Sequence, residues 1–167
     1  MNIKHIFAST LVLLSLLMGA ALAGPAFSGK AILTVSGKID EKNQANGFAL
    51  DLEMLEKLPQ QNFSTLTPWD KKPIKFTGPL LRDVLALVKA NGTRIKAIAL
   101  NDYQTSIPIS DATRFNVIVA YKMNDETIPV KTKGPLFIVY PYDQDETLRS
   151  TVYYERSAWQ LKALIIE

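Results

Sequence analysis

Short apolar segments, each closed by turn-forming residues, are the feature that most limits how this chain folds. The segment 31–35 ends at Ser36-Gly37, and the segment 74–76 ends at Thr77-Gly78-Pro79. Short runs rich in β-branched residues and bounded by such turns are typical of strands. Strand character also marks residues 48–50, 61–67, 95–100, 104–107, 117–121, 127–130, 136–140 and 159–166. The chain is therefore expected to be rich in sheet.

Helical periodicity is clearest over residues 81–90, whose apolar stripe consists of Leu81, Val84, Leu85 and Val88. A shorter helix is expected over 52–58, with Asp51 as its N-cap and Pro59 as its end. Many strands with one strong helix and one or two lesser ones predict an α+β fold. No internal repeat or low-complexity linker divides the sequence, so a single domain is expected.

One hairpin is predicted from the turn chemistry alone. Asn124 and Asp125 are residue types that tolerate the backbone of a tight turn. They are expected to pair the segment 117–121 with the segment 127–130.

The first 23 residues predict a secretory signal peptide, which leaves residues 24–167 as the domain. A weakly basic start precedes an apolar run over 6–18, and Ala21-Leu22-Ala23 supplies the small residues before an expected cleavage at Gly24. A membrane anchor is the weaker alternative, because a spanning helix needs about 20 apolar residues. The signal lacks an arginine pair, so it predicts export of an unfolded chain to a periplasmic or secreted location.

Missing residue types exclude several kinds of chemistry. The sequence has no cysteine, and its single histidine, His5, lies within the predicted signal peptide. A cysteine nucleophile, a Ser-His-Asp triad, a His-ligated metal and disulfides are therefore excluded from the expected mature chain. The formal net charge is +3, a small surplus spread along the chain, so nucleic acid is not an expected partner.

Four stretches concentrate polar and aromatic side chains at predicted strand ends and connections, where binding groups commonly lie. They are residues 63–70, 101–103, 131–135 together with 140–143, and 153–159. Each has a purely structural alternative, such as a turn at 101–103 or core-edge packing of Trp69 and Trp159. The acidic residues at 143, 145 and 146 lack the spacing of a calcium loop, so no metal site is predicted.

The order of the motifs along the chain is more informative than any one of them. The ordered set is 33–37, 52–59, Trp69, 76–85, 99–103, 107–108, 133–136, 140–141 and 159–161. In this order the motifs resemble the oxidoreductase molybdopterin-binding domain of the sulfite-oxidase type, in a short, exported, stand-alone form. The resemblance implies a mixed, β-rich α+β fold. It also implies a cleft that, in that family, holds a pterin bearing molybdenum.

Three features depart from the pattern of catalytic family members. In those members a cysteine four residues before the tryptophan binds the metal, and the matching position before Trp69 is Thr65. The basic residue that contacts the cofactor after the Gly-Pro motif is absent, since Gly134-Pro135 is followed by apolar residues. The predicted export route would deliver a chain without cofactor. These departures predict a protein that holds no metal and performs no molybdenum chemistry.

The expected function is a non-catalytic binding or sensory protein that keeps the old cofactor cleft for a small molecule or a peptide. A membrane-bound signalling partner fits such a role. A molybdopterin-dependent oxidoreductase is the main alternative, and a structural protein whose cleft is filled by its own side chains is a third. The expected pocket residues are Thr65, Trp69, Asn101, Asp102, Tyr103, Lys133, Tyr140, Arg156 and Trp159.

Overall fold

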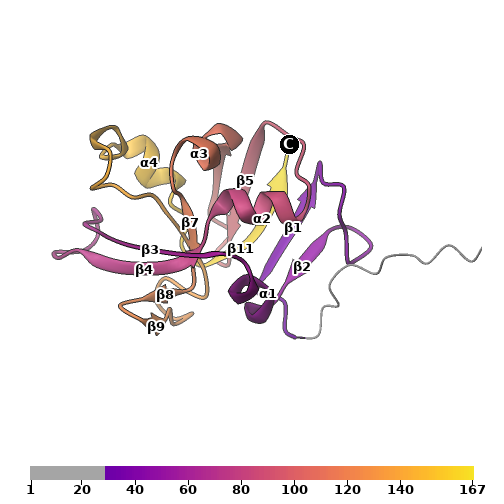
Figure 1. Ribbon diagram of the computed structural model, residues 1–167, viewed down its shortest axis with the longest axis horizontal. Helices are drawn as coiled ribbons and strands as arrows, with labels where there is room; N and C mark the ends of the chain where they lie inside the picture. Colours follow the sequence, from indigo (N-terminus) through magenta and orange to yellow (C-terminus); the bar gives the residue numbers. More distant parts are fainter. Residues whose placement is uncertain (1–28) are drawn as a thin grey trace, which may run out of the picture.

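A five-stranded sheet forms one side of the computed structural model, which describes residues 29–167 (Figure 1). Its order is β2 (Phe48–Leu50), β1 (Leu33–Gly37), β11 (Leu161–Ile166), β5 (Arg94–Ala99) and β6 (Gln104–Pro108). β1 and β11 are parallel, whereas the other neighbours in this sheet are antiparallel. The first and last strands of the domain therefore lie side by side at the centre of the sheet.

The rest of the strands form two smaller sheets. A four-stranded sheet has the order β3 (Gln60–Thr65), β4 (Ile74–Pro79), β8 (Lys122–Met123) and β9 (Glu126–Thr127). A two-stranded sheet pairs β7 (Ile118–Ala120) with β10 (Phe137–Val139). Gly78 lets β4 and β7 approach closely, because a Cβ atom there would lie 2.1 Å from the carbonyl oxygen of Val119.

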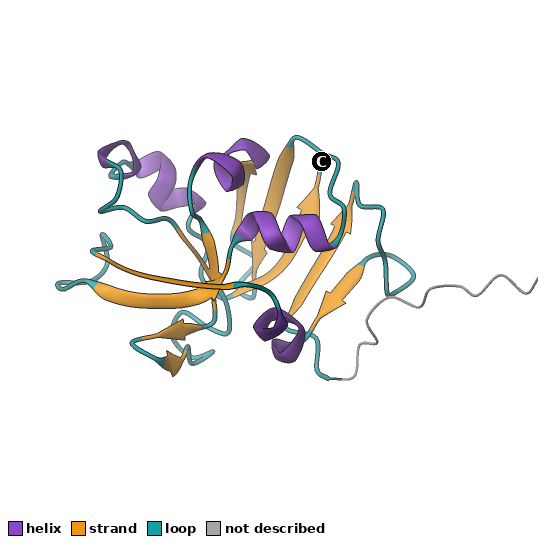
Figure 2. Ribbon diagram, in the orientation of Figure 1, coloured by secondary structure: helices purple, strands orange, loops and turns teal. Residues whose placement is uncertain are grey.

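The helices are short and lie around the sheets (Figure 2). They are α1 (Leu52–Lys57), α2 (Leu81–Leu87), α3 (Ile109–Arg114), the 3₁₀ turn η1 (Glu146–Leu148) and α4 (Thr151–Arg156). The predicted N-cap of α1 is confirmed, since Asp51 accepts a hydrogen bond from the Met54 N–H at 2.9 Å. The expected α+β class with a sheet-rich core is confirmed as well.

The sequence prediction misses or misplaces some helix boundaries. α2 ends at Leu87 rather than at residue 90, and Lys89 just beyond it has a left-handed backbone with φ of 49°. α3 and α4 were not predicted. Each has six residues, and α4 has no buried residue, so neither presents the repeated apolar stripe that reveals a longer helix.

The predicted turn at Asn124-Asp125 is confirmed, but the predicted strand pairing is wrong. Both residues have positive φ, 50° and 67°, as hairpin turns of this kind require. The turn joins the two-residue strands β8 and β9, whereas β7 pairs with β10. The hairpin ends early because Pro129 has no N–H to donate, and the Ile128 N–H makes the last bond, to the Tyr121 carbonyl.

The core runs continuously through all three sheets, and its centre is the segment around β10. Phe137, Ile138, Val139, Tyr140 and Tyr142 have no exposed surface. Burial of this much apolar surface supplies most of the driving force for folding. The predicted buried run over residues 136–140 is therefore confirmed.

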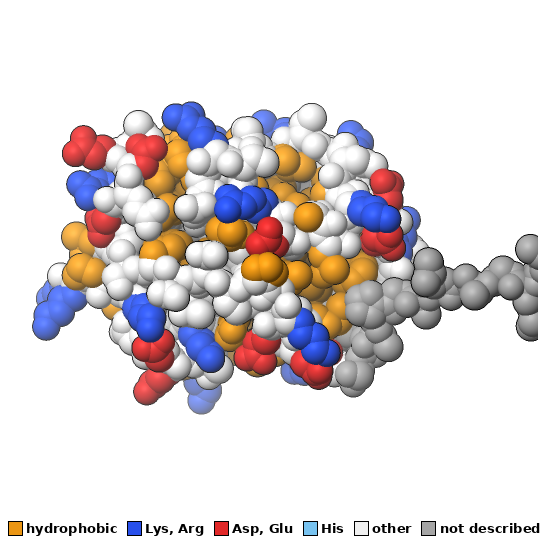
Figure 3. Space-filling view, in the orientation of Figure 1, with side chains coloured by type: hydrophobic (Ala, Val, Ile, Leu, Met, Phe, Trp, Pro, Cys, Tyr) orange, Lys and Arg blue, Asp and Glu red, His pale blue; other side chains and the backbone are white. Residues whose placement is uncertain are grey.

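The charged side chains of the described residues are mixed over the surface. Basic and acidic side chains are interspersed on the face in Figure 3, in line with a small charge surplus spread along the chain. No helix within residues 29–167 is long and apolar enough to cross a membrane. The predicted signal peptide lies outside the described residues.

Candidate functional site

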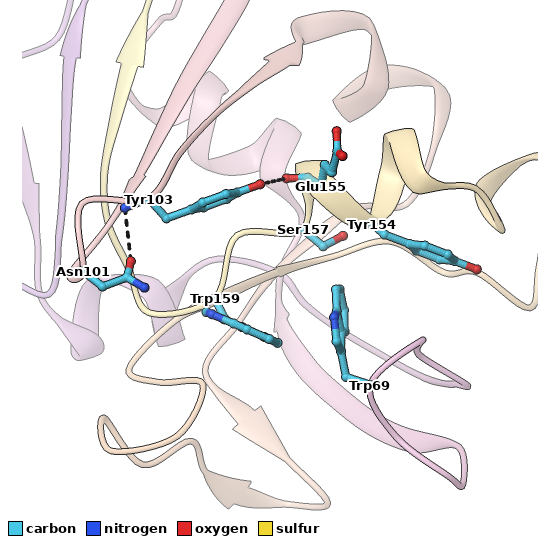
Figure 4. Close-up of a pocket in the computed structure, with 7 residues that line it drawn as sticks. All are labelled: Trp69, Asn101, Tyr103, Tyr154, Glu155, Ser157 and Trp159. Carbon is cyan, nitrogen blue, oxygen red and sulfur yellow. Dashed lines mark hydrogen bonds between the residues drawn. The ribbon is translucent and has the colours of Figure 1, made fainter.

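An open pocket of about 370 Å³ lies where three separate parts of the chain meet (Figure 4). These parts are the β3–β4 connection, the β5–β6 connection, and α4 with the connection that follows it to β11. The lining residues are Trp69, Asn101, Tyr103, Tyr154, Glu155, Ser157 and Trp159. The three connections come from different regions of the sequence, so the pocket exists only in the folded chain.

Aromatic rings form the walls of this pocket at steep angles to one another. The centroid of the Trp69 ring lies 5.1 Å from that of Trp159, with 60° between the planes. The Tyr154 ring lies 6.2 Å from Trp69 at 66°. Phe137 of the core contacts both tryptophan rings, at centroid distances of 5.9 and 6.2 Å. The two partly exposed indoles are therefore packed against the buried Phe137 ring, which holds them in place.

Tyr103 forms the opposite wall and is held at both ends (Figure 4). Its backbone N–H donates to Asn101 Oδ1 at 3.1 Å, and its phenol O–H donates to the Glu155 carbonyl at 2.8 Å. Asp102 between them has φ of 64°, which places the connection in a tight turn. The hydrogen bond to Glu155 joins the β5–β6 connection to α4, and the Tyr103 side chain remains 42% exposed.

Lys133 lies against the two tryptophans and is paired with an acid. Its Nζ is 2.7 Å from Asp70 Oδ2 and 5.8 Å from the ring centroids of both Trp69 and Trp159. Distances below about 6 Å allow a cation–π attraction. Thr67 Oγ1 also donates to Asp70 Oδ2, at 2.6 Å. Burial raises the pKa of Asp70, but the hydrogen bonds from Lys133 and Thr67 and the lysine charge outweigh it and lower that pKa overall.

Thr65 lies at the end of β3 and does not line the pocket. It has no exposed surface, and its Oγ1 accepts a hydrogen bond from the Asp143 N–H at 3.1 Å. The Asp143 carboxylate in turn accepts from the Leu66 N–H at 2.7 Å and from Arg149 at 2.9 Å. The Leu66 N–H, followed by the partners Arg149 and Thr65, lowers the pKa of Asp143 despite some opposing burial.

A second pocket, of about 300 Å³, lies beside this cluster. It is lined by Leu66, Thr67, Pro68, Asp143, Arg149 and Tyr154. Tyr154 lines both pockets, so the two depressions share one aromatic wall.

Tyr140 and Arg156 belong to a buried polar cluster around Asp111. Asp111 Oδ2 accepts from the Tyr140 O–H at 2.8 Å and from Arg156 Nη1 at 2.9 Å. Burial, followed by the charge of Asp111 and the hydrogen bond to it, raises the pKa of Tyr140, so this phenol stays protonated. The cluster joins α3, α4 and the segment after β10, and its role is structural.

The structure brings together part of the predicted site. Trp69, Asn101, Tyr103 and Trp159 line the pocket, and Lys133 contacts its tryptophans. Asp102 instead lies on the surface, where its carboxylate pairs with Lys162 at 2.7 Å. The remaining predicted residues lie outside the pocket lining, namely Thr65, Tyr140 and Arg156.

Three lining residues were absent from the predicted set, namely Tyr154, Glu155 and Ser157. All three belong to the stretch 153–159, whose aromatic and polar density was the available signal in the sequence. The Ser157 hydroxyl hydrogen-bonds with the Tyr142 O–H and donates to the Tyr153 carbonyl at 2.8 Å. The Ser157 hydroxyl is therefore occupied by hydrogen bonds within the protein. The Tyr154 phenol and the Glu155 carboxylate make no such bond among the described residues, so they can contact a ligand.

Comparisons with known proteins identify the family. The family model described as the oxidoreductase molybdopterin binding domain matches residues 33–143. The chain belongs to this family, and its fold is of the sulfite-oxidase-like type. No curated protein matches the chain.

A solved structure supports the same fold. The chain is similar to the sulfane dehydrogenase SoxCD from Paracoccus pantotrophus, with a TM-score of 0.60 and 14% sequence identity. The match covers 80% of this chain and 37% of that one, so this chain spans little more than a third of its relative. At this identity the likeness concerns the fold alone.

The family implies a pterin cofactor bearing molybdenum, and the side chains here test whether such a group fits. The donor at position 65 is a buried hydroxyl already bonded to a backbone N–H, and a hydroxyl is a poor ligand for a soft, sulfur-bound metal. Among residues 29–167, no cluster of His, Cys, Asp and Glu has the arrangement of a metal site. A carboxylate pairs with each of Lys133, Arg149 and Arg156, whereas Lys71 and Lys72 of the β3–β4 connection take part in no ion pair among the described residues. These side chains do not fit a metal that is ligated by the protein.

Proposed function

We propose that this chain is an exported binding protein that uses a molybdopterin-binding-type fold without catalysing a redox reaction. The observation that carries the proposal is the state of Thr65, which occupies the position of the metal-binding cysteine. Its hydroxyl is fully buried and accepts a hydrogen bond from the Asp143 N–H at 3.1 Å. The side chain therefore acts as a structural link at the place where catalytic members bind metal.

The pocket supports a ligand-binding role. Its volume of about 370 Å³ lies in the range of small-molecule sites, and such sites are usually lined by aromatic and apolar side chains with a few polar groups, as this one is. Tyr103 is held in place by hydrogen bonds from both its backbone and its side chain. A pre-organised wall of this kind lowers the entropic cost of binding. A small molecule or the side chain of a peptide is the proposed ligand.

A partner protein fits the surface around the pocket. Within residues 29–167, most of the exposed large apolar side chains lie on the elements that border it, namely Leu66, Trp69, Leu100, Tyr103 and Val152, whereas Val130 lies in the β9–β10 connection. Exposed apolar surface of this kind is typical of interaction sites. The proposed partner is a membrane-bound signalling protein, and the predicted signal peptide supports a periplasmic or secreted location for the encounter.

Membership of the family favours a second candidate, a molybdopterin-dependent oxidoreductase. Such an enzyme would have to hold its cofactor without a cysteine thiolate, because the sequence has no cysteine. Its metal would have to lie near Thr65, which does not line the aromatic pocket, so the two candidates differ in what the chain binds and where.

Native mass spectrometry of the protein purified from its own cells tests the proposal. We expect the folded chain to carry a small non-covalent adduct that is released on denaturation. The variant Tyr103→Leu, which removes one wall of the pocket, should lose the adduct while its unfolding temperature stays close to that of the wild type. An adduct with the mass of a molybdenum-bearing pterin would support the oxidoreductase instead, and a wild-type chain without any adduct would contradict both.

A further inference from the structure

We infer that the aromatic pocket binds a compact organic cation of the substituted-ammonium class. The aromatic box is defined here as Trp69, Tyr103, Tyr154 and Trp159, which line the pocket together. This inference rests on the proposed binding function, and it names the chemistry of the ligand.

The angles between the rings favour a compact group over a flat one. Trp69 is inclined by 60° to Trp159 and by 66° to Tyr154. A planar ligand is held best between parallel rings, whereas inclined rings enclose a rounded group on several sides. The electron-rich faces of such rings attract a cation, and aromatic cages are a recurring way of binding substituted ammonium groups.

The box already carries one ammonium group from the protein itself. Lys133 Nζ lies 5.8 Å from the ring centroids of Trp69 and Trp159, and its charge is balanced by Asp70 at 2.7 Å. The two indoles therefore form an environment in which a positive charge is stable. Because Asp70 compensates the lysine, repulsion between Lys133 and a bound cation is weakened.

The charge of the pocket lining itself also favours a cation over an anion. Glu155 is the one charged residue of the lining, and among the described residues it takes part in no ion pair. A carboxylate pairs with each of Lys133, Arg149 and Arg156. Lys71 and Lys72 of the β3–β4 connection take part in no ion pair among the described residues, but they are exposed and do not line the pocket. Figure 4 shows the Glu155 carboxylate at the rim and turned away from the tryptophans, so it acts through its field rather than by contact.

Tryptophan fluorescence provides a direct test, because both tryptophans of the chain line the pocket. The purified protein is titrated with choline chloride, with its uncharged isostere 3,3-dimethyl-1-butanol and with inorganic phosphate, at matched ionic strength. We expect a saturable change with choline and binding about fivefold or more tighter than that of the isostere.

The outcomes separate this inference from the binding function on which it rests. Equal or tighter binding of the uncharged isostere or of phosphate overturns the cation inference while leaving a ligand pocket in place. No saturable change with any of the three probes also overturns it. The binding function is judged separately, by the adduct on the protein from its own cells.

Variants identify which groups supply the attraction. Tyr103→Leu should weaken choline binding about fivefold or more, whereas Tyr103→Phe keeps the ring and should stay within about threefold of the wild type. Glu155→Gln should weaken choline binding by about two- to fivefold and reduce its salt dependence, while binding of the isostere is unchanged. Glu56→Gln, on the exposed side of α1, is the matched control and should have no effect. Equal losses in Glu155→Gln and Glu56→Gln would overturn the role of Glu155.

Discussion

Thr65 and Asp143 are joined by a hydrogen bond between distant parts of the chain: Thr65 Oγ1 accepts from the Asp143 N–H at 3.1 Å. A second hydrogen bond joins the same two segments, because the Asp143 carboxylate accepts from the Leu66 N–H at 2.7 Å. The end of β3 is thus fixed to the segment that follows β10. Thr65, which the resemblance to the family matches to the metal-binding cysteine, is therefore part of a structural link in this chain.

Removing the Thr65 hydroxyl should destabilise the fold. Thr65→Val keeps the shape of the side chain but leaves the Asp143 N–H without its acceptor, which should cost about 1–3 kcal/mol of unfolding free energy. Thr65→Ser keeps the hydroxyl and should lose less, about 1 kcal/mol, for the missing methyl group. Urea unfolding measures both values. A valine variant as stable as the wild type would show that the hydrogen bond does not stabilise the fold.

Asp143 should make the stability of the protein depend on acidic pH. Its pKa in the folded state is lowered, chiefly by the Leu66 N–H, so it stabilises the fold above its unfolded-state pKa of about 4. That contribution is lost as the pH falls below about 4 through the lowered folded-state pKa. Asp143→Asn should therefore be less stable than the wild type at pH 7, by about 0.5 kcal/mol because solvent screens this exposed carboxylate, and the difference should shrink at pH 3.

Unfolding at both pH values measures this effect, and an exposed ion pair supplies the control. Asp125 pairs with Lys75 on the surface, so Asp125→Asn should change stability by about 0.5 kcal/mol or less. A constant difference between Asp143→Asn and the wild type from pH 7 to pH 3 would contradict the assignment.

Lys133 should keep the Asp70 carboxylate ionised at low pH. In Lys133→Met the charge and hydrogen bond of the lysine are lost, while burial still raises the pKa of Asp70. The acid transition of tryptophan fluorescence should therefore move to higher pH, because the Lys133–Asp70 pair adjoins both indoles. Asp70→Asn should remove this transition. An identical midpoint in the wild type and Lys133→Met would contradict the coupling.

The sequence predicts best those helices whose capping residues or apolar stripe lie within or directly beside the helix itself. Asp51 and Pro59 mark the beginning and end of α1, and the stripe of α2 identifies its buried face. The pairing of β7 with β10 could not be predicted in this way. Both strands are fully buried, so they show no alternation that would indicate a neighbour.

The site residues, too, could be predicted only in part from the sequence. Trp69 and Trp159 were predictable as aromatics in connections, and they meet in the pocket. Arg156 and Glu155 are adjacent on α4, yet the arginine binds Asp111 and the glutamate lines the pocket. A six-residue helix without a buried face gives no sequence pattern to distinguish these two directions.

Gly78 should be required for the contact between β4 and β7. Gly78→Ala would place a Cβ atom 2.1 Å from the Val119 carbonyl oxygen, so one strand would have to move. We expect a loss of about 1–3 kcal/mol or more in unfolding free energy. Lys75→Ala, an exposed change on the same strand, should cost about 1 kcal/mol or less. Equal stability of Gly78→Ala and the wild type would contradict the close approach.

The molybdenum content of the protein purified from its native compartment tests the central claim most directly. Elemental analysis would compare the wild type with Thr65→Cys, and a catalytic family member produced in the same cells would serve as the positive control. We predict no stoichiometric molybdenum in either, because a thiol at position 65 does not restore the missing basic contact or the loading of cofactor before export. Stoichiometric molybdenum in the wild type would contradict the non-catalytic function, and its appearance in Thr65→Cys alone would show that the cysteine was the single missing element.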